Sequence, residues 1–137
     1  MTNNYEHSLD SAGRLIVPSK LREKLGQVFY VAPGSQENLT IYPLETWARL
    51  TARVSELDTA DAEDMDVFFG LALRCEADKQ WRFQLSPTLK EYAGIDRDVV
   101  ITGNNDRAQI WNREKWEARR KEITPAKIAE LMRRYKV

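Results

Sequence analysis

The chain has 137 residues, of which 42% are hydrophobic and 31% are charged, and its 21 basic residues balance 21 acidic ones. Such a chain can bury a core without disulfides or metal, and its composition excludes a disordered or collagen-like protein. The single cysteine, Cys75, excludes an intramolecular disulfide and a zinc site built on two thiolates. Because the start of the sequence lacks an export signal and no apolar run reaches membrane-spanning length, we expect a cytoplasmic protein.

Charge is distributed unevenly along the neutral chain. Residues 56–66 contain six acidic residues and no basic one, so this stretch would repel phosphate. Residues 14–24 carry four basic residues against one acidic, and residues 113–136 carry nine against four. The two basic segments are candidates for phosphate contact, although basic runs are also typical of solvated helix faces.

An internal repeat at a shift of 68 to 69 residues organises the sequence. Residues 10–17 align with 78–85, residues 21–23 with 89–91, and residues 41–47 with 110–116. Self-similarity at one shift predicts two copies of a single module. We expect four segments, namely a first unit at 4–50, an acidic helical connector at 51–67, a second unit at 68–116 and a basic helical tail at 117–137.

The first unit is predicted to open with a β-hairpin. Its strands cover residues 5–10 and 14–17, and the turn between them needs the conformational freedom of Gly13. Pro18 and Ser19 end the second strand and begin a short helix, which Gly26 terminates.

Two further strands, at residues 27–32 and 39–42, precede a longer helix that starts after Pro43. Apolar side chains recur along that helix at helical spacing and are expected to face the core, namely Trp47, Leu50, Val54 and Leu57.

The second unit is predicted to repeat this order. The expected elements are a strand at 68–77, a helix at 87–93, strands at 99–102 and 108–111, a helix from Asn112, and a final helix after Thr124-Pro125. Because each unit has only short strands and little apolar surface, we expect the two units to interleave their strands into one mainly β core with twofold pseudo-symmetry.

Residues 5–22 resemble the N-terminal signature of the MraZ family, whose hallmark Asp-x-x-Gly-Arg is shared with AbrB-like domains. The likeness continues through 68–70, 75–80, 89–95 and 98–100 to Ile110-Trp111, in the right order along nearly the whole chain. The resemblance implies an α+β fold of tandem AbrB-like double-split β-barrel units with flanking helices, and subunits assembled into rings.

The same resemblance implies a function. It points to a non-enzymatic, nucleoid-associated transcriptional regulator that binds double-stranded DNA at repeated promoter elements, characteristically those of the division and cell-wall gene cluster. No cofactor, membrane or small-molecule substrate is implied.

The resemblance also implies a DNA-facing role for the signature arginines. A guanidinium held after a rigid turn can clamp a phosphate or the O6/N7 edge of guanine. Asp10 and Asp78 would shape the turns and orient these arginines, although each arginine could instead only close an ion pair with its own aspartate. The candidates in order of rank are Arg14 and Arg82, with Lys79, Lys20 and Arg22 beside them.

The second signature departs from the family pattern, since Trp81 stands where the first copy has Gly13. A positive φ at this position would strain a tryptophan or change the turn type. Gln84 replaces Ile16 and Ser86 replaces Pro18, so the second copy looks degenerate. Either Trp81 stacks on nucleic acid or packs between subunits, or the second copy has lost its contact with DNA.

Three other functions compete with DNA binding. An enzyme is disfavoured because the chain has one histidine, His7, and one cysteine, with no phosphate-binding glycine loop and no metal-ligand cluster. A ring-forming structural or protein-interaction descendant that has lost DNA binding remains open. An antitoxin role fits less well, because antitoxins of this type usually have one domain and a disordered tail. His7 and Cys75 are expected to be packing residues.

Overall fold

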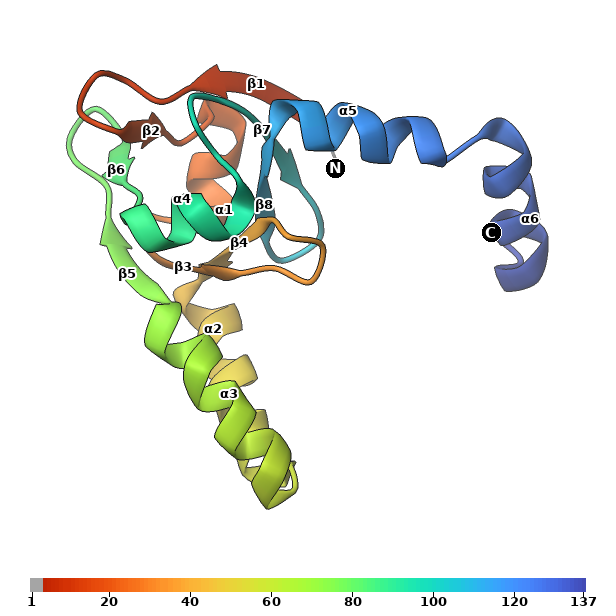
Figure 1. Ribbon diagram of the computed structural model, residues 1–137, viewed down its shortest axis with the longest axis horizontal. Coiled ribbons are helices and arrows are strands. Elements are labelled where there is room, and N and C mark those ends of the chain that lie inside the picture. Colours follow the sequence, from red (N-terminus) through yellow and green to blue (C-terminus); the bar gives the residue numbers. More distant parts are fainter. Residues whose placement is uncertain (1–3) are drawn as a thin grey trace.

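The computed structural model of the protein describes residues 4–137. In this range the chain forms eight strands, six α-helices and two short 3-10 helices, so the predicted α+β class is confirmed (Figure 1). The first half contains β1 (Asn4–Ser8), β2 (Arg14–Ile16), η1 (Ser19–Leu21), α1 (Arg22–Leu25), β3 (Val28–Pro33), β4 (Leu39–Pro43), α2 (Leu44–Arg53), η2 (Val54–Glu56) and α3 (Thr59–Leu71). The second half contains β5 (Leu73–Glu76), β6 (Arg82–Gln84), α4 (Pro87–Ala93), β7 (Asp98–Gly103), β8 (Ala108–Asn112), α5 (Arg113–Glu122) and α6 (Pro125–Tyr135).

The two halves interleave, as expected from their short strands. A six-stranded antiparallel sheet has the order β1-β7-β8-β4-β3-β5, and β2 and β6 form a separate two-stranded antiparallel sheet. Each half therefore pairs its strands with those of the other half: β1 with β7, β2 with β6, β3 with β5 and β4 with β8. We call this interleaved part, residues 4–43 and 73–112, the β-body.

The predicted hairpin of the first unit is wrong. The turn forms, but β1 pairs with β7 and β2 pairs with β6, instead of with each other. The register of β2 and β6 places Leu15 opposite Phe83, and both side chains are buried. Burial of such a side chain contributes about 1.5–3 kcal/mol, which two short exposed strands could not gain alone.

The core lies inside the β-body and draws on both halves. Phe29 of β3 packs edge to face on Phe83 of β6, with 5.0 Å between ring centroids. Ile41 from the first half and Ile101 and Ile110 from the second are also fully buried there. The core therefore depends on strands from both halves, and neither half could enclose it by itself.

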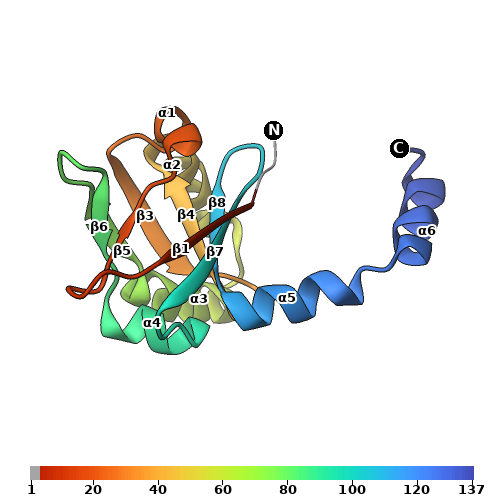
Figure 2. The same ribbon diagram turned by 90° about the horizontal axis from the view of Figure 1, so that it is seen from above.

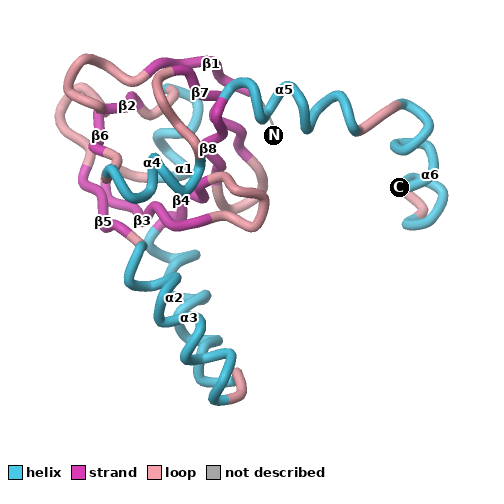
Figure 3. The backbone as a smooth tube through the Cα atoms, viewed as in Figure 1, coloured by secondary structure: helices cyan, strands magenta, loops and turns pink. Residues whose placement is uncertain are grey.

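Two helical projections leave the β-body in different directions. The helices α2 and α3 run side by side as one projection, and α5 leads to α6 as the other (Figures 1 and 3). Figure 2, turned by 90°, again shows α6 standing apart from the β-body. Within the described residues, no helix is long and apolar enough to cross a membrane.

Two predictions are wrong in the helical projection formed by α2 and α3. Residues 68–71 are the last turn of α3 rather than strand, and β5 begins only at Leu73. The reason is aromatic packing, because Trp47 of α2 lies 6.0 Å from Phe68 and 5.6 Å from Phe69 between ring centroids, and it also stacks on Tyr30 at 4.5 Å.

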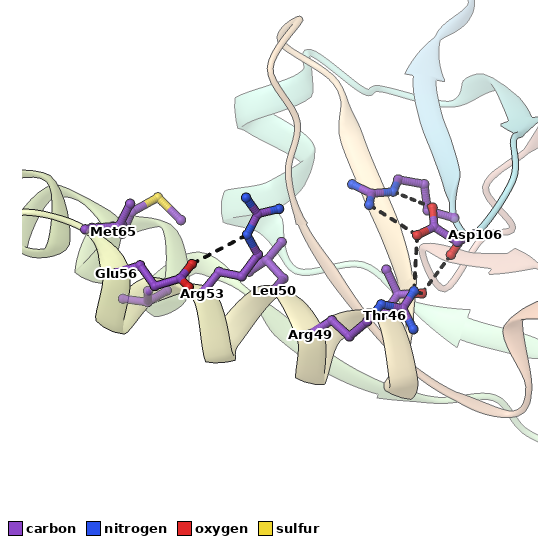
Figure 4. A pocket seen from close by; sticks show the side chains of 10 residues that line it. Thr46, Arg49, Leu50, Arg53, Glu56, Met65 and Asp106 are labelled. Carbon is purple, nitrogen blue, oxygen red and sulfur yellow. Dashed lines mark hydrogen bonds and ion pairs between the residues drawn. The ribbon is translucent and has the colours of Figure 1, made fainter.

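The apolar stripe of α2 accordingly does not continue into the core of the β-body. Leu50, Val54 and Leu57 line a groove outside it, together with Met65 of α3 (Figure 4), and Leu57 is 41% exposed.

Candidate nucleic-acid interface

The first signature folds into a tight turn organised by one carboxylate. Asp10 Oδ1 accepts hydrogen bonds from the backbone N–H groups of Ala12 and Arg14, both at 2.9 Å. Asp10 Oδ2 accepts from Nε of Arg14, also at 2.9 Å. The backbone N–H of Gly13, at φ 77°, donates to the carbonyl of Asp10 and closes the turn. The aspartate therefore fixes both the turn and the direction of the arginine.

The second turn reproduces this pattern. Asp78 Oδ1 accepts from the backbone N–H groups of Gln80 at 2.8 Å and Arg82 at 2.9 Å, and its Oδ2 accepts from Nε of Arg82 at 2.9 Å. The pKa of Asp78, like that of Asp10, is lowered, first by the backbone N–H of the following arginine and then by the second N–H and the guanidinium. Both carboxylates are thus ionised at neutral pH, as orienting groups must be.

The two arginines are held in the same way by their aspartates and remain available to bind a ligand. The side chains of Arg14 and Arg82 are each 34% exposed. Each uses Nε for the ion pair with its aspartate, and among residues 4–137 the terminal guanidinium nitrogens have no hydrogen-bond acceptor. Each arginine can therefore form the ion pair with its aspartate and still bind DNA. The ion pair orients the guanidinium through Nε, and the terminal nitrogens keep their hydrogen-bond donors.

The strands β2 and β6 present both arginines on one surface. Their register pairs Arg14 with Gln84 and Ile16 with Arg82, whereas Leu15 and Phe83 point into the core. Directly opposed residues of an antiparallel pair share a face, so the outer face of this β-ribbon carries Arg14, Ile16, Arg82 and Gln84. A two-stranded ribbon of this kind fits the major groove of B-DNA.

Trp81 keeps the turn type despite its size. Its φ is 62°, and its backbone N–H donates to the carbonyl of Asp78 at 2.9 Å, as Gly13 does to Asp10. The half-buried indole packs against the core, and the guanidinium of Arg22 lies over its ring at 5.4 Å from the centroid. The second turn is therefore not degenerate in geometry, because contacts of the indole offset the cost of the left-handed backbone.

The remaining candidates from the sequence differ in how far other contacts constrain their side chains. Lys20 is exposed on η1, just after β2, and Lys79 is exposed at the tip of the second turn. Arg22 is more constrained, since its Nε donates to the carbonyl of Val17 at 3.0 Å while its guanidinium covers Trp81. Lys20 and Lys79 thus remain available for a phosphate. Arg22 instead supports the second turn by covering Trp81.

Two cations beside the first turn were missed in the sequence. Lys90 and Arg97, together with Asp96, line a polar groove of about 630 Å³ with residues 9–13. Lys90 aligns with Arg22 in the repeat, and each lies beside the turn of the opposite unit. The repeat alignment could have indicated Lys90, but nothing in the sequence pointed to Arg97.

Gln84 gives the first turn a support that the second turn lacks. Its Nε2 donates to the carbonyl of Ala12 at 2.8 Å and lies 3.2 Å from where a Cβ on Gly13 would be. The equivalent residue, Ile16, has no polar group to do the same for the second turn. The two turns share one geometry and differ in what braces them.

The single cysteine and the single histidine of the sequence both lie within strands, Cys75 in β5 and His7 in β1. Cys75 is 4% exposed, and burial raises the pKa of its thiol to about 12, which confirms its prediction as a core residue. His7 lies in β1 opposite Val99, and partial burial lowers its pKa. Among residues 4–137, no group of three histidine, cysteine or acidic side chains could hold a metal ion.

The fold and the turns together define a class of protein in which two copies of one module interlock and present paired Asp–Arg turns on a β-ribbon. A family described as "MraZ protein, putative antitoxin-like" matches this chain twice, over residues 1–67 and 68–134. The chain belongs to the MraZ family, as the resemblance indicated.

Similar curated proteins agree with this family assignment. Proteins named "Transcriptional regulator MraZ" from Finegoldia magna and Acetivibrio thermocellus are 39% and 40% identical to this chain, covering 84% and 83% of it and 82% of each relative. A protein of the same name from Heliobacterium modesticaldum is 39% identical over 93% of both chains. The name of these relatives describes a regulator and not a class of enzyme.

Proposed function

We propose that this protein is a transcriptional regulator that binds double-stranded promoter DNA through the outer face of the β2–β6 ribbon. The observation that carries the proposal is the pair of arginines, Arg14 and Arg82, on one exposed surface. Each is oriented by an aspartate, and no acceptor in the described part of the chain, residues 4–137, engages its terminal nitrogens. The names of the relatives support the same function.

The ribbon would enter the major groove with its arginines leading. A planar guanidinium whose Nε is already occupied can direct its two terminal nitrogens at the O6 and N7 of guanine, or at two phosphate oxygens. The aspartate fixes the direction before DNA arrives, so less side-chain entropy is lost on binding. Sequence would be read by the arginines, and Lys20, Lys79 and Lys90 would position the ribbon through phosphates.

Neutral overall charge implies modest affinity for a single site, so we propose an oligomer that engages several repeated promoter elements at once. The targets would be the elements of a division and cell-wall gene cluster, and the protein would reside in the cytoplasm at the nucleoid.

We further propose that the interleaved strands of the β-body correspond to the double-split barrel of AbrB-like domains.

Fluorescence anisotropy with DNA from upstream of the protein's own gene, at two salt concentrations, tests the proposal. We expect saturable binding by the wild type that weakens as salt rises. Arg14→Ala should weaken binding by about 5- to 150-fold, since one good bidentate contact contributes about 1–3 kcal/mol.

Arg120→Ala is the matched control, because this exposed arginine lies on α5, away from the ribbon. It should bind DNA like the wild type. Equal losses in both variants would instead indicate binding by bulk charge in the basic tail. A folded, oligomeric wild type that binds none of this DNA would favour the protein-interaction alternative.

A further inference from the structure

The two ends of the β2–β6 ribbon carry the same arginine but a different neighbour beside it. Arg14 lies opposite Gln84, and Arg82 lies opposite Ile16. Gln84 and Ile16 occupy equivalent positions of the repeat, and both are exposed. The outer face of the ribbon is therefore symmetric in its arginines and asymmetric in the side chains next to them, of which one is an amide and the other a hydrocarbon.

The amide of Gln84 is held in one orientation by the first turn. Its Nε2 donates to the carbonyl of Ala12 at 2.8 Å and more weakly to the carbonyl of Gly13 at 3.5 Å. Because both acceptors belong to the turn, the NH2 group faces the turn and Oε1, on the other side of the planar amide, faces away from it. Within residues 4–137, no donor reaches Oε1. Gln84 thus presents a fixed hydrogen-bond acceptor.

Arg14 and Gln84 are close enough to contact the same or neighbouring base pairs. Directly opposed residues of an antiparallel pair have Cβ atoms about 4.5–5.5 Å apart, and successive base pairs are about 3.4 Å apart along the helix axis. A ribbon that brings the guanidinium of Arg14 to a base edge therefore brings the amide of Gln84 to that base pair or the next one.

An acceptor in the major groove separates the bases into two classes. Adenine N6 and cytosine N4 are amino groups that donate, whereas guanine O6 and thymine O4 are acceptors that would oppose Oε1. A glutamine with both amide groups free reads adenine through N6 and N7 together. Since the Nε2 of Gln84 is occupied by the first turn, this residue reads the amino group alone. Ile16, at the other end, has no acceptor and suits the methyl group of thymine.

We propose that Gln84 is a specificity-determining residue, whose Oε1 accepts a hydrogen bond from an exocyclic amino group, adenine N6 or cytosine N4, at or next to the base pair read by Arg14. The inference rests on the proposed binding of promoter DNA and names the base chemistry that one end of the ribbon reads. Guanine and thymine are rejected on that strand, because two acceptors would face each other without a proton between them.

Gln84 could instead only brace the first turn, and the second turn shows how to separate the two roles. The second turn keeps the same backbone hydrogen bonds although its equivalent residue, Ile16, cannot brace it. Gln84→Ile therefore makes the two ends alike and should fold, since isoleucine favours strands. Loss of a brace weakens binding to every sequence alike, whereas loss of a base contact removes a preference at one position.

The probe is a duplex from upstream of the protein's own gene, from whose bases single amino groups are removed. Each adenine is replaced in turn by nebularine, which lacks the N6 amino group, and each cytosine by 2-pyrimidinone, which lacks the N4 amino group. In fluorescence anisotropy we expect at least one replacement to weaken binding of the wild type by about 2- to 10-fold, the range of one net hydrogen bond. The same replacement should leave binding by Gln84→Ile unchanged. A sensitive adenine assigns N6 as the donor, and a sensitive cytosine assigns N4.

Ile16→Ala is the matched control, because Ile16 is exposed on the same face at the other end of the ribbon. It should keep the wild-type response to removal of the amino group. Weaker pairing of the modified bases is controlled as well, since Gln84→Ile meets the same modified duplex. Circular dichroism should show that both variants are folded.

Two results would overturn the inference. One is a wild type that binds the unmodified duplex and is indifferent to every removed amino group. The other is a Gln84→Ile variant that responds to each replacement as the wild type does, which would assign the amino contact to another residue. Failure of the proposed function looks different, because the wild type and Arg14→Ala would then bind the unmodified duplex equally or not at all, and the inference would fall with it.

Discussion

Replacing Trp81 by glycine should weaken the fold, although it restores the residue type of the first turn. At φ 62° a tryptophan is disfavoured by about 1–2 kcal/mol, and glycine would relieve this strain. The substitution also exposes the site of a half-buried indole, at about 2.5 kcal/mol for roughly 100 Å². The cation–π contact with Arg22 contributes about 0.5–1 kcal/mol more. We therefore expect the free energy of unfolding to fall by about 1–3 kcal/mol.

Urea unfolding followed by far-ultraviolet circular dichroism measures this change as a lower midpoint at constant slope. Trp81→Ala is the informative companion, because alanine loses the indole and keeps the strain. It should be less stable than Trp81→Gly by about 1 kcal/mol. A Trp81→Gly variant more stable than the wild type would refute the reasoning, since it would mean that strain outweighs packing.

The same variant reports on the role of the indole in binding. The ring of Trp81 packs against the core and lies under the guanidinium of Arg22. Trp81→Gly should therefore bind DNA within a few-fold of the wild type. A much larger loss in a folded variant would instead show that the indole contacts nucleic acid.

The remaining predictions concern the second arginine, the aspartates and the cysteine. Because Arg82 is held and exposed like Arg14, Arg82→Ala should weaken DNA binding about as much in the same anisotropy assay, which revises the ranking made from sequence; an unaffected Arg82→Ala would restore it. The lowered pKa values of Asp10 and Asp78 mean that the stabilisation they give is present above the ordinary aspartate pKa of about 3.9 and is lost as pH falls through the lower folded values. Acid unfolding should therefore depend less steeply on pH in Asp10→Asn/Asp78→Asn, and an identical acid transition would contradict the assignment. Burial and the pKa of about 12 should protect Cys75 from iodoacetamide at pH 8 until the protein is unfolded in urea, as mass spectrometry can follow.

Strand pairing was the feature that local sequence patterns predicted least well. The positions of β2, the turn at Gly13 and the short α1 follow from proline, glycine and branched residues that act over a few positions. Which strand pairs with which depends instead on contacts between residues about 70 positions apart, such as Leu15 with Phe83. The sequence therefore predicted interleaving from the small size of each unit, but it misassigned β1 and β2 as a hairpin.

The sequence by itself determined the duplication, the order of the elements and the identity of the signature residues, because these depend on local propensity and on the repeat. Only the tertiary structure brought Arg14 and Arg82 to one face of a ribbon, placed Lys90 and Arg97 beside the first turn, and put Trp81 under Arg22. It also turned residues 68–71 into helix, where the aromatic contacts of Phe68 and Phe69 with Trp47 outweigh their strand propensity. In each case the deciding free energy comes from packing between segments distant in the chain, which no local pattern records.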